Sequence, residues 1–346
     1  MPPAERDHNK KKPWLKPALI TLKLLISLGL LAFLIHNADI DLHELRGSLA
    51  KTDPLYVFLA LLTPYAGFFI TSLRWKGLLD VQGVHIRQPV LFRSCMVAVF
   101  FNQIMPSTIG GDMIRMYDSW KAGATRAVAI STIVVDRVLG LFALAIFAVL
   151  GLFFVRGDFS EAQYVPLAVV AVAMGLGGFI ALVFSPFRLM VDFARAVYTR
   201  LPGPFGKFFG KVDRAVEPFR GRHSSLTRAL GLSLVLQLNV VLMHYLLSRA
   251  IGIELGFIDY FYVVPVALFV MLIPISINGI GVRENMFVFL LGTMGVAKAD
   301  ALLLSLLAFA VFLVHGLMGG LVLASRGISP AQLAKDAATP TPGAAA

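Results

Sequence analysis

Eight apolar stretches fill most of this 346-residue chain. An apolar stretch of about 20 residues is long enough to cross a lipid bilayer as a helix. Only 15% of the residues are charged, against about 25% in soluble domains. Because little sequence lies between the stretches, we expect an all-α polytopic membrane protein without a separate soluble catalytic domain. The predicted spans are 17–36, 55–74, 90–106, 127–155, 164–184, 228–249, 260–277 and 301–325.

Two short polar segments interrupt this apolar pattern, and they share the same order of residue types. The first, Pro106 to Arg115, reads P-S-T-I-G-G-D-M-I-R, and the second, Pro274 to Arg283, reads P-I-S-I-N-G-I-G-V-R. Proline, glycine and charged side chains are costly in hydrocarbon unless protein or water satisfies the freed polar groups. A matched pair of such breaks in two halves of a membrane protein is typical of a transport site. The expected broken elements are 107–120 and 278–296, which extend the third and seventh spans as hairpins.

The distribution of lysine and arginine predicts the orientation. The basic segment 1–16 and the long basic connection 185–227 are expected in the cytoplasm, and the acidic connection 37–54 outside. The tail 326–346 is predicted to be disordered and cytoplasmic. These assignments leave one transmembrane domain, 17–325. Within it we expect six full transmembrane helices and two opposed re-entrant or broken-helix hairpins, arranged as an inverted repeat.

Each break offers groups that can bind an anion. Ser107 and Thr108 can cap a new half-helix, whose free amide groups and dipole attract negative charge. Arg115, about one turn further on, can donate two hydrogen bonds to a phosphate, and glycine lets a half-helix approach its neighbours closely. The second break likewise contains a polar residue, glycines and an arginine in this order. The residues predicted to bind substrate are Ser107, Thr108, Gly110, Gly111, Arg115, Arg137, Asn278, Gly279, Gly281 and Arg283.

Acidic residues beside the arginines leave a second interpretation open. Asp112 precedes Arg115 by three residues, so the two can pair on one helix face. Glu284 can pair with Arg137 or Arg115 across the bundle. Such pairs can act as structural glue alone, although buried charges cost more than apolar packing does. The residues expected to balance the arginine charges or carry protons are Asp112, Asp136 and Glu284.

Three segments together resemble a known membrane family. They are Asn102 to Tyr117, Asp136 to Gly140 (D-R-V-L-G) and Gly279 to Glu284 (G-I-G-V-R-E). The family is the lysylphosphatidylglycerol synthase transmembrane-region family, also called flippase-like or UPF0104, and the resemblance spans about residues 15–325. It implies a polytopic protein of the bacterial inner membrane, related to the part of those synthases that moves lipid between leaflets. The aminoacyl-transferase domain of the larger synthases has no counterpart before Ala346, so lysine transfer is not expected.

We therefore expect a flippase-like transporter of an anionic phospholipid or lipid-linked substrate, and not an enzyme. No cofactor and no metal site is expected, and the single cysteine excludes an intrachain disulfide. Membrane lipids are the expected partners. Nucleic acid is not an expected partner, because the basic residues that give the net charge of +11 lie in the connections between spans. Whether the chain forms a homo-oligomer is left open.

Two other functions stay open as well. Asp39 and Asp41 form a D-x-D pattern that can hold a divalent metal, as in a glycosyl- or phospho-transferase that uses a polyprenyl-phosphate lipid. The third interpretation is a non-transporting partner in envelope biogenesis.

Overall fold

The computed structural model describes residues 42–105, 109–154, 221–273, 276 and 278–326, together with scattered positions within 25–34 and 174–219. Every regular element in that part of the chain is a helix, which confirms the all-α prediction there. Two predicted spans, 17–36 and 164–184, lie mostly outside the described residues.

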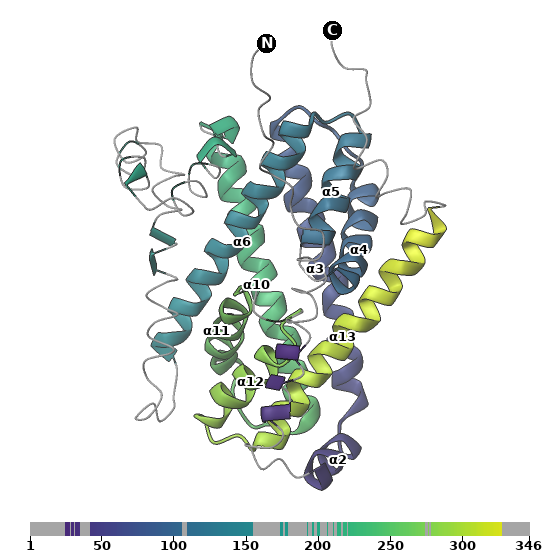
Figure 1. Cartoon of the computed structure of the whole chain (residues 1–346), viewed down its shortest axis with the longest axis vertical. Coiled ribbons are helices and arrows are strands. Elements are labelled where there is room, and N and C mark those ends of the chain that lie inside the picture. The colour runs from purple at the N-terminus through teal and green to yellow at the C-terminus, as the bar shows by residue number, and fades with distance from the viewer. Residues whose placement is uncertain are drawn as a thin grey trace, which may run out of the picture.

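The described helices follow the order long, short, short, long twice along the chain (Figure 1). The first series consists of α3 (Pro54–Val81), α4 (Gln88–Ile104), α5 (Ile109–Lys121) and α6 (Arg126–Phe154). The second consists of α10 (His223–Ile251), α11 (Tyr260–Met271), α12 (Val282–Gly292) and α13 (Lys298–Ser325). Three short elements precede α3, α10 and α11, namely α2 (Leu42–Ala50), η1 (Glu217–Phe219) and η2 (Phe257–Asp259).

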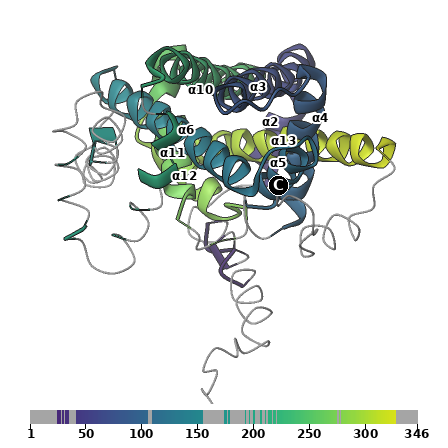
Figure 2. The ribbon, with the colours of Figure 1, turned by 90° about the horizontal axis from the view of Figure 1, so that it is seen from above.

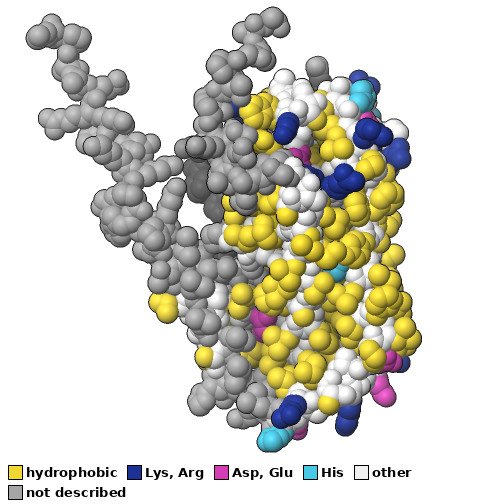
Figure 3. Space-filling view, turned by 90° about the vertical axis from the view of Figure 1, so that its right-hand side faces the viewer, with side chains coloured by type: hydrophobic (Ala, Val, Ile, Leu, Met, Phe, Trp, Pro, Cys, Tyr) yellow, Lys and Arg dark blue, Asp and Glu magenta, His cyan; other side chains and the backbone are white. Residues whose placement is uncertain are grey.

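The four long helices are apolar and long enough to cross a membrane. A helix of 28 residues, such as α3, extends about 42 Å, which exceeds the roughly 30 Å of a hydrocarbon core. Large apolar side chains of α3, α10 and α13 are exposed, including Phe58, Leu238 and Leu317. On the face shown in Figure 3, apolar side chains cover most of the area between charged groups at the two ends. Such a surface suits lipid rather than water. The described part of the chain thus contains four candidate spans.

The four short helices form two hairpins that start from opposite ends of the molecule (Figure 1). The α4–α5 hairpin begins after α3 and returns before α6, whereas the α11–α12 hairpin lies between α10 and α13 at the other end. Their turns meet inside the bundle, where Asn278 Nδ2 donates to the main-chain oxygen of Gln103 at 3.2 Å. Seen from above, α3 packs along α10, and α13 contacts both α4 and α12 (Figure 2).

The second break is longer than the sequence indicates. Element 278–296 was expected to begin at Asn278, but α12 begins only at Val282. Asn278, Gly279 and Gly281 have φ angles of 52°, 75° and 82°, which are incompatible with a right-handed helix. Two of the three positions are therefore glycines. The first broken element, expected over 107–120, is helical from Ile109 to Lys121.

One predicted span ends too early. The span predicted over 55–74 is shorter than the helix, because α3 continues beyond Arg74 to Val81. Arg74 is buried in the bundle, where Asp136 balances its charge. We call the end of the molecule where α3 ends and α4, α6 and α10 begin the basic end. Basic side chains described there include Lys76, Arg87, Arg93, Lys121, Arg126, Arg222, Arg228 and Arg326, and acidic ones include Asp80, Asp118 and Glu217.

Candidate functional site

Two arginines from different helices converge on one aspartate in the first series. Arg74 Nε on α3 lies 2.6 Å from Asp136 Oδ1 on α6. Arg115 Nη1 on α5 lies 2.9 Å from the other carboxylate oxygen of Asp136. All three residues are at most 6% exposed. A buried charge is tolerated only when it is paired and hydrogen-bonded, so each member of this group requires the others.

Two further charges join this group at its outer side. Asp112 Oδ2 on α5 accepts a hydrogen bond from Arg137 Nε on α6 at 2.8 Å. Its other oxygen lies 3.8 Å from Arg115 Nη1. The short contact of Asp112 is therefore with Arg137, and its contact with Arg115 on the same helix is the weaker one. We call Arg74, Asp112, Arg115, Asp136 and Arg137 the arginine cluster. It has three cations and two anions, and hence one positive charge in excess.

Arg115 is under-satisfied as a hydrogen-bond donor. Its Nε and Nη2 atoms are buried and have no partner in the described part of the chain. The guanidinium carbon lies 4.6 Å from the ring centre of Trp75, whose indole nitrogen is likewise buried without a described partner. Buried donors without acceptors cost roughly 1–3 kcal/mol each. An anion with several oxygens is the kind of ligand that satisfies such donors.

The second series holds a smaller charged group, which we call the Arg283 pair (Arg283 and Glu284 on α12). The guanidinium of Arg283 pairs with Glu284 and donates to Ser305 Oγ on α13 at 3.1 Å. Its carbon lies 4.5 Å from the ring centre of Phe309. Glu284 Oε2 also accepts the main-chain N–H of Gly281 at 2.6 Å. Both charged residues are buried.

The expected pairing of Glu284 with Arg137 or Arg115 is wrong. The carboxylate of Glu284 is held inside its own hairpin, by Arg283 and by the first free N–H of α12. The predicted charged residues accordingly lie in two groups, and the two hairpins contact each other through Asn278 and the main chain of Gln103. The two groups still share three features: a buried arginine on a short helix, a carboxylate partner, and an aromatic ring from a long helix.

The amino-acid sequence of this chain matches a known family. The sequence model described as "Lysylphosphatidylglycerol synthase TM region" matches residues 20–319. The chain belongs to this family. A UPF0104 membrane protein of Methanothermobacter thermautotrophicus is 23% identical over 295 residues, covering 80% of this chain and 86% of the relative. One of Pyrococcus horikoshii is 22% identical over 292 residues, covering 79% and 87%. One of Methanocaldococcus jannaschii is 32% identical over 149 residues, covering 42% and 44%.

The glycines of the first break hold this family member's α5 close to α4. A Cβ atom on Gly111 would lie 2.6 Å from Ala98 O, closer than real Cβ contacts occur. The main-chain N–H of Gly111 donates to Asn102 Oδ1 at 2.8 Å. Asn102 was not among the predicted site residues, yet it satisfies a free amide in the first turn of α5. Ser107 and Thr108, the predicted caps, lie outside the described residues.

Three residues of this site were not among those predicted from the sequence. They are Arg74, its partner Ser233 on α10, and Trp75, whose ring lies against Arg115. Arg74 Nη1 donates to Ser233 Oγ on α10 at 2.7 Å, which ties α3 to α10 beside the arginine cluster. One signal was present: Leu78 and Leu79 continue the apolar pattern beyond Arg74, and both are fully buried.

The described residues contain no group of three or more His, Cys, Asp or Glu side chains that could hold a metal ion. Asp39 and Asp41, the D-x-D pattern of the sequence, lie outside them.

Proposed function

We propose that this protein is a flippase-like transporter that moves an anionic phospholipid or a lipid-linked anionic substrate between the two leaflets of a membrane, and that it is not an enzyme. One observation carries the proposal. Two half-length hairpins from opposite ends of an apolar helical bundle meet at Gln103 and Asn278, and each bears a buried arginine. Irregular backbone at this depth serves transport in many membrane proteins.

The same arrangement supports an inverted repeat. Helix α3 runs toward the basic end and α10 runs away from it, so the two long–short–short–long series have opposite directions (Figure 1). With spans 17–36 and 164–184 added, the proposed topology has six full crossings and two re-entrant hairpins. The excess of lysine and arginine at the basic end supports its placement in the cytoplasm, in the cytoplasmic membrane, with membrane lipids as partners. The chain can act alone or as a homo-oligomer.

The chemistry of the arginine cluster suits a carrier of phosphate groups. An empty site keeps its arginines paired with Asp112 and Asp136. An incoming phosphate offers oxygens to the unsatisfied donors of Arg115 and Trp75 and replaces a carboxylate as the arginine partner. Because one anion replaces another beside the arginine, the free-energy cost of a buried and unpaired cation is avoided. The Arg283 pair provides an equivalent exchange in the opposite hairpin.

Proteoliposomes that carry a fluorescent phosphatidylglycerol test the proposal, with chemical quenching of the outer leaflet as the readout. We expect the wild-type chain to exchange the probe between leaflets. The double variant Arg115→Ala and Arg283→Ala should lose exchange by about 10- to 100-fold for each arginine, since charge-assisted hydrogen bonds are lost. A fluorescent phosphatidylcholine tests the preference for an anionic head group.

The matched control removes two exposed arginines, Arg87 and Arg93, by the same substitutions. It should exchange the probe at the wild-type rate. Wild-type exchange by the Arg115 and Arg283 double variant would remove both arginines from transport.

A further inference from the structure

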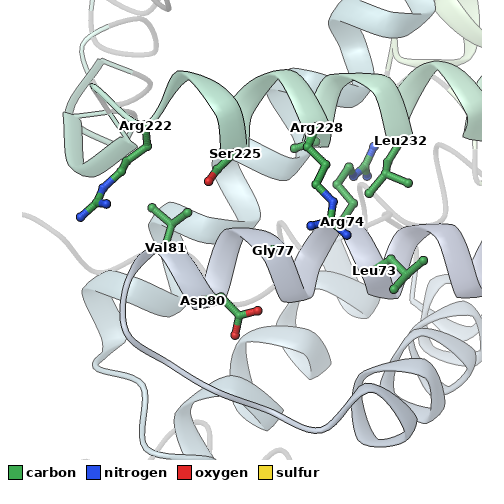
Figure 4. Close-up of a pocket in the computed structure, with 10 residues that line it drawn as sticks. Leu73, Arg74, Gly77, Asp80, Val81, Arg222, Ser225, Arg228 and Leu232 are labelled. Carbon is green, nitrogen blue, oxygen red and sulfur yellow. The ribbon is translucent and has the colours of Figure 1, made fainter.

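A pocket of about 320 Å³ opens at the basic end, between the end of α3 and the start of α10 (Figure 4). It lies beside the arginine cluster and shares one residue with it, Arg74. Figure 4 shows Arg228 directed from α10 toward Arg74 on α3. We call this the basic pocket and define it by Arg74, Gly77, Arg222, Ser225 and Arg228. Its volume equals that of about ten water molecules, which is enough for a phosphate and part of a head group.

The basic pocket carries uncompensated positive charge. Three arginines and one aspartate, Asp80, line it. The carboxylate of Asp80 is already engaged, at 2.6 Å by Lys76 Nζ and at 2.9 Å by His85 Nδ1. No carboxylate in the described part of the chain forms an ion pair with Arg222 or Arg228. A hollow lined by three arginines, whose one carboxylate is already engaged by other side chains, attracts an anion.

The walls of the basic pocket also leave room for a ligand. A Cβ atom added to Gly77, in the middle of the pocket wall on α3, would meet no atom within 4 Å. Ser225 is the third residue of α10, in the first turn, where main-chain N–H groups have no partner within the helix and the helix dipole is positive. These groups supplement the arginines as donors to phosphate oxygens.

Arg74 connects the basic pocket to the buried centre of the molecule. Its Nε is bound to Asp136 and its Nη1 to Ser233, while its side chain lines the pocket. A phosphate in the pocket competes with Asp136 for the guanidinium of Arg74. Asp136 in turn holds Arg115. Occupation of the pocket therefore changes the charge balance around Asp136, the residue through which the pocket is linked to Arg115.

We infer that the basic pocket binds the phosphate group of the transported lipid in the leaflet at the basic end, as the loading site for the arginine cluster. This inference rests on the proposed function for the identity of the ligand. The recognised chemistry is a phosphate monoester or diester, and free phosphate offers the same oxygens. A test must therefore separate a lipid head group from a soluble anion, and binding from transport.

Binding of a fluorescent short-chain phosphatidylglycerol to the full chain in phosphatidylcholine nanodiscs provides that test. The double variant Arg222→Ala and Arg228→Ala should weaken binding by about tenfold or more, because two charge-assisted contacts are lost. The double variant Arg87→Ala and Arg93→Ala removes the same charge from exposed positions and should bind as the wild type does. Equal binding by the two double variants would overturn the inference, since it would reflect general attraction of lipid to a basic surface.

A second pair of variants fills the pocket without changing charge. Gly77→Leu places a side chain in the hollow, and Gly231→Leu makes the same change on α10 at a glycine that also meets no atom within 4 Å. Gly77→Leu should abolish saturable binding, and Gly231→Leu should preserve it, with thermal unfolding confirming that both chains fold. Unchanged binding by Gly77→Leu would overturn the inference.

Competition separates the two sources of phosphate. Inorganic phosphate should displace the lipid probe only at concentrations far above that of the probe. Displacement at equal concentration would overturn the assignment to lipid and make the pocket a site for soluble phosphate. Saturable binding by a wild-type chain that exchanges no lipid in liposomes would refute the proposed transport and leave the phosphate site standing.

Discussion

At the scale of single residues, Asp136 has the largest role in the charged centre. It is 1% exposed and forms the ion pairs of both Arg74 and Arg115. Asp136→Asn keeps the shape and removes the charge. We expect this variant to lose about 3–5 kcal/mol of stability, because it leaves the guanidinium groups of Arg74 and Arg115 buried without a charged partner at this position. The midpoint of thermal unfolding in detergent measures the loss.

A triple variant separates structural glue from a transport role. Arg74→Met, Arg115→Met and Asp136→Leu together replace the buried charges by apolar side chains, which is often neutral or stabilising. The triple variant should therefore unfold near the wild-type midpoint and yet fail to exchange lipid. Normal exchange by a stable triple variant would mean that these charges serve packing alone.

The residues of the arginine cluster differ in how readily the local sequence identifies them as site residues. Arg115 and Asp112 stand beside proline and glycine in a break, and Asp136 and Arg137 interrupt an apolar run. Arg74 lies near the end of a span, where a charge is ordinary. Its role depends on a partner 62 positions away. No local pattern encodes such a contact, since it arises only when α3 and α6 pack together.

At the scale of helices, the close approach of α5 to α4 depends on Gly111. A Cβ atom there would lie 2.6 Å from Ala98 O and 2.7 Å from Asn102 Oδ1. We expect Gly111→Ala to destabilise the chain by about 1–3 kcal/mol, because an overpacked contact must shift a helix. Thermal unfolding of the purified chain measures this effect.

The control is the same substitution at Gly231, where no atom lies within 4 Å of the added Cβ. Gly231→Ala should gain about 0.5–1 kcal/mol, because alanine favours a helix interior more than glycine does. If both variants unfold at the same temperature, the α4–α5 contact is looser than described.

Helix breaks were easier to predict than helix ends. Proline and glycine within apolar runs predicted both hairpins, since these residues end helices through local sterics. The start of α12 at Val282 depends instead on three positive φ angles and on the side chain of Glu284, which accepts the N–H of Gly281. Similarly, α3 extends beyond Arg74 because of a tertiary ion pair. Helix propensity, which depends on local sequence, does not predict contacts of this kind.

At the scale of the whole molecule, transport as proposed requires the two hairpin turns to separate. Loop charges and span lengths predicted hairpins from opposite ends, but the contact between Asn278 and the main chain of Gln103 appears only in the folded chain. The sequence contains one cysteine, Cys95, which is buried. A Cys95→Ala chain with Gln103→Cys and Asn278→Cys can therefore be linked selectively by a short bifunctional methanethiosulfonate. Both positions are half-buried and so accessible to the reagent.

We expect the linked chain to exchange fluorescent phosphatidylglycerol no faster than protein-free liposomes do, and reduction of the linker to restore exchange. The reason is geometric: a head group that passes from the arginine cluster to the Arg283 pair must cross the level at which the turns touch. Each single-cysteine variant, treated with the same reagent, controls for modification alone and should keep its rate. Unimpaired exchange by a fully linked chain would show that lipid passes without separation of the hairpins, and the path would then have to lie along their outer surfaces.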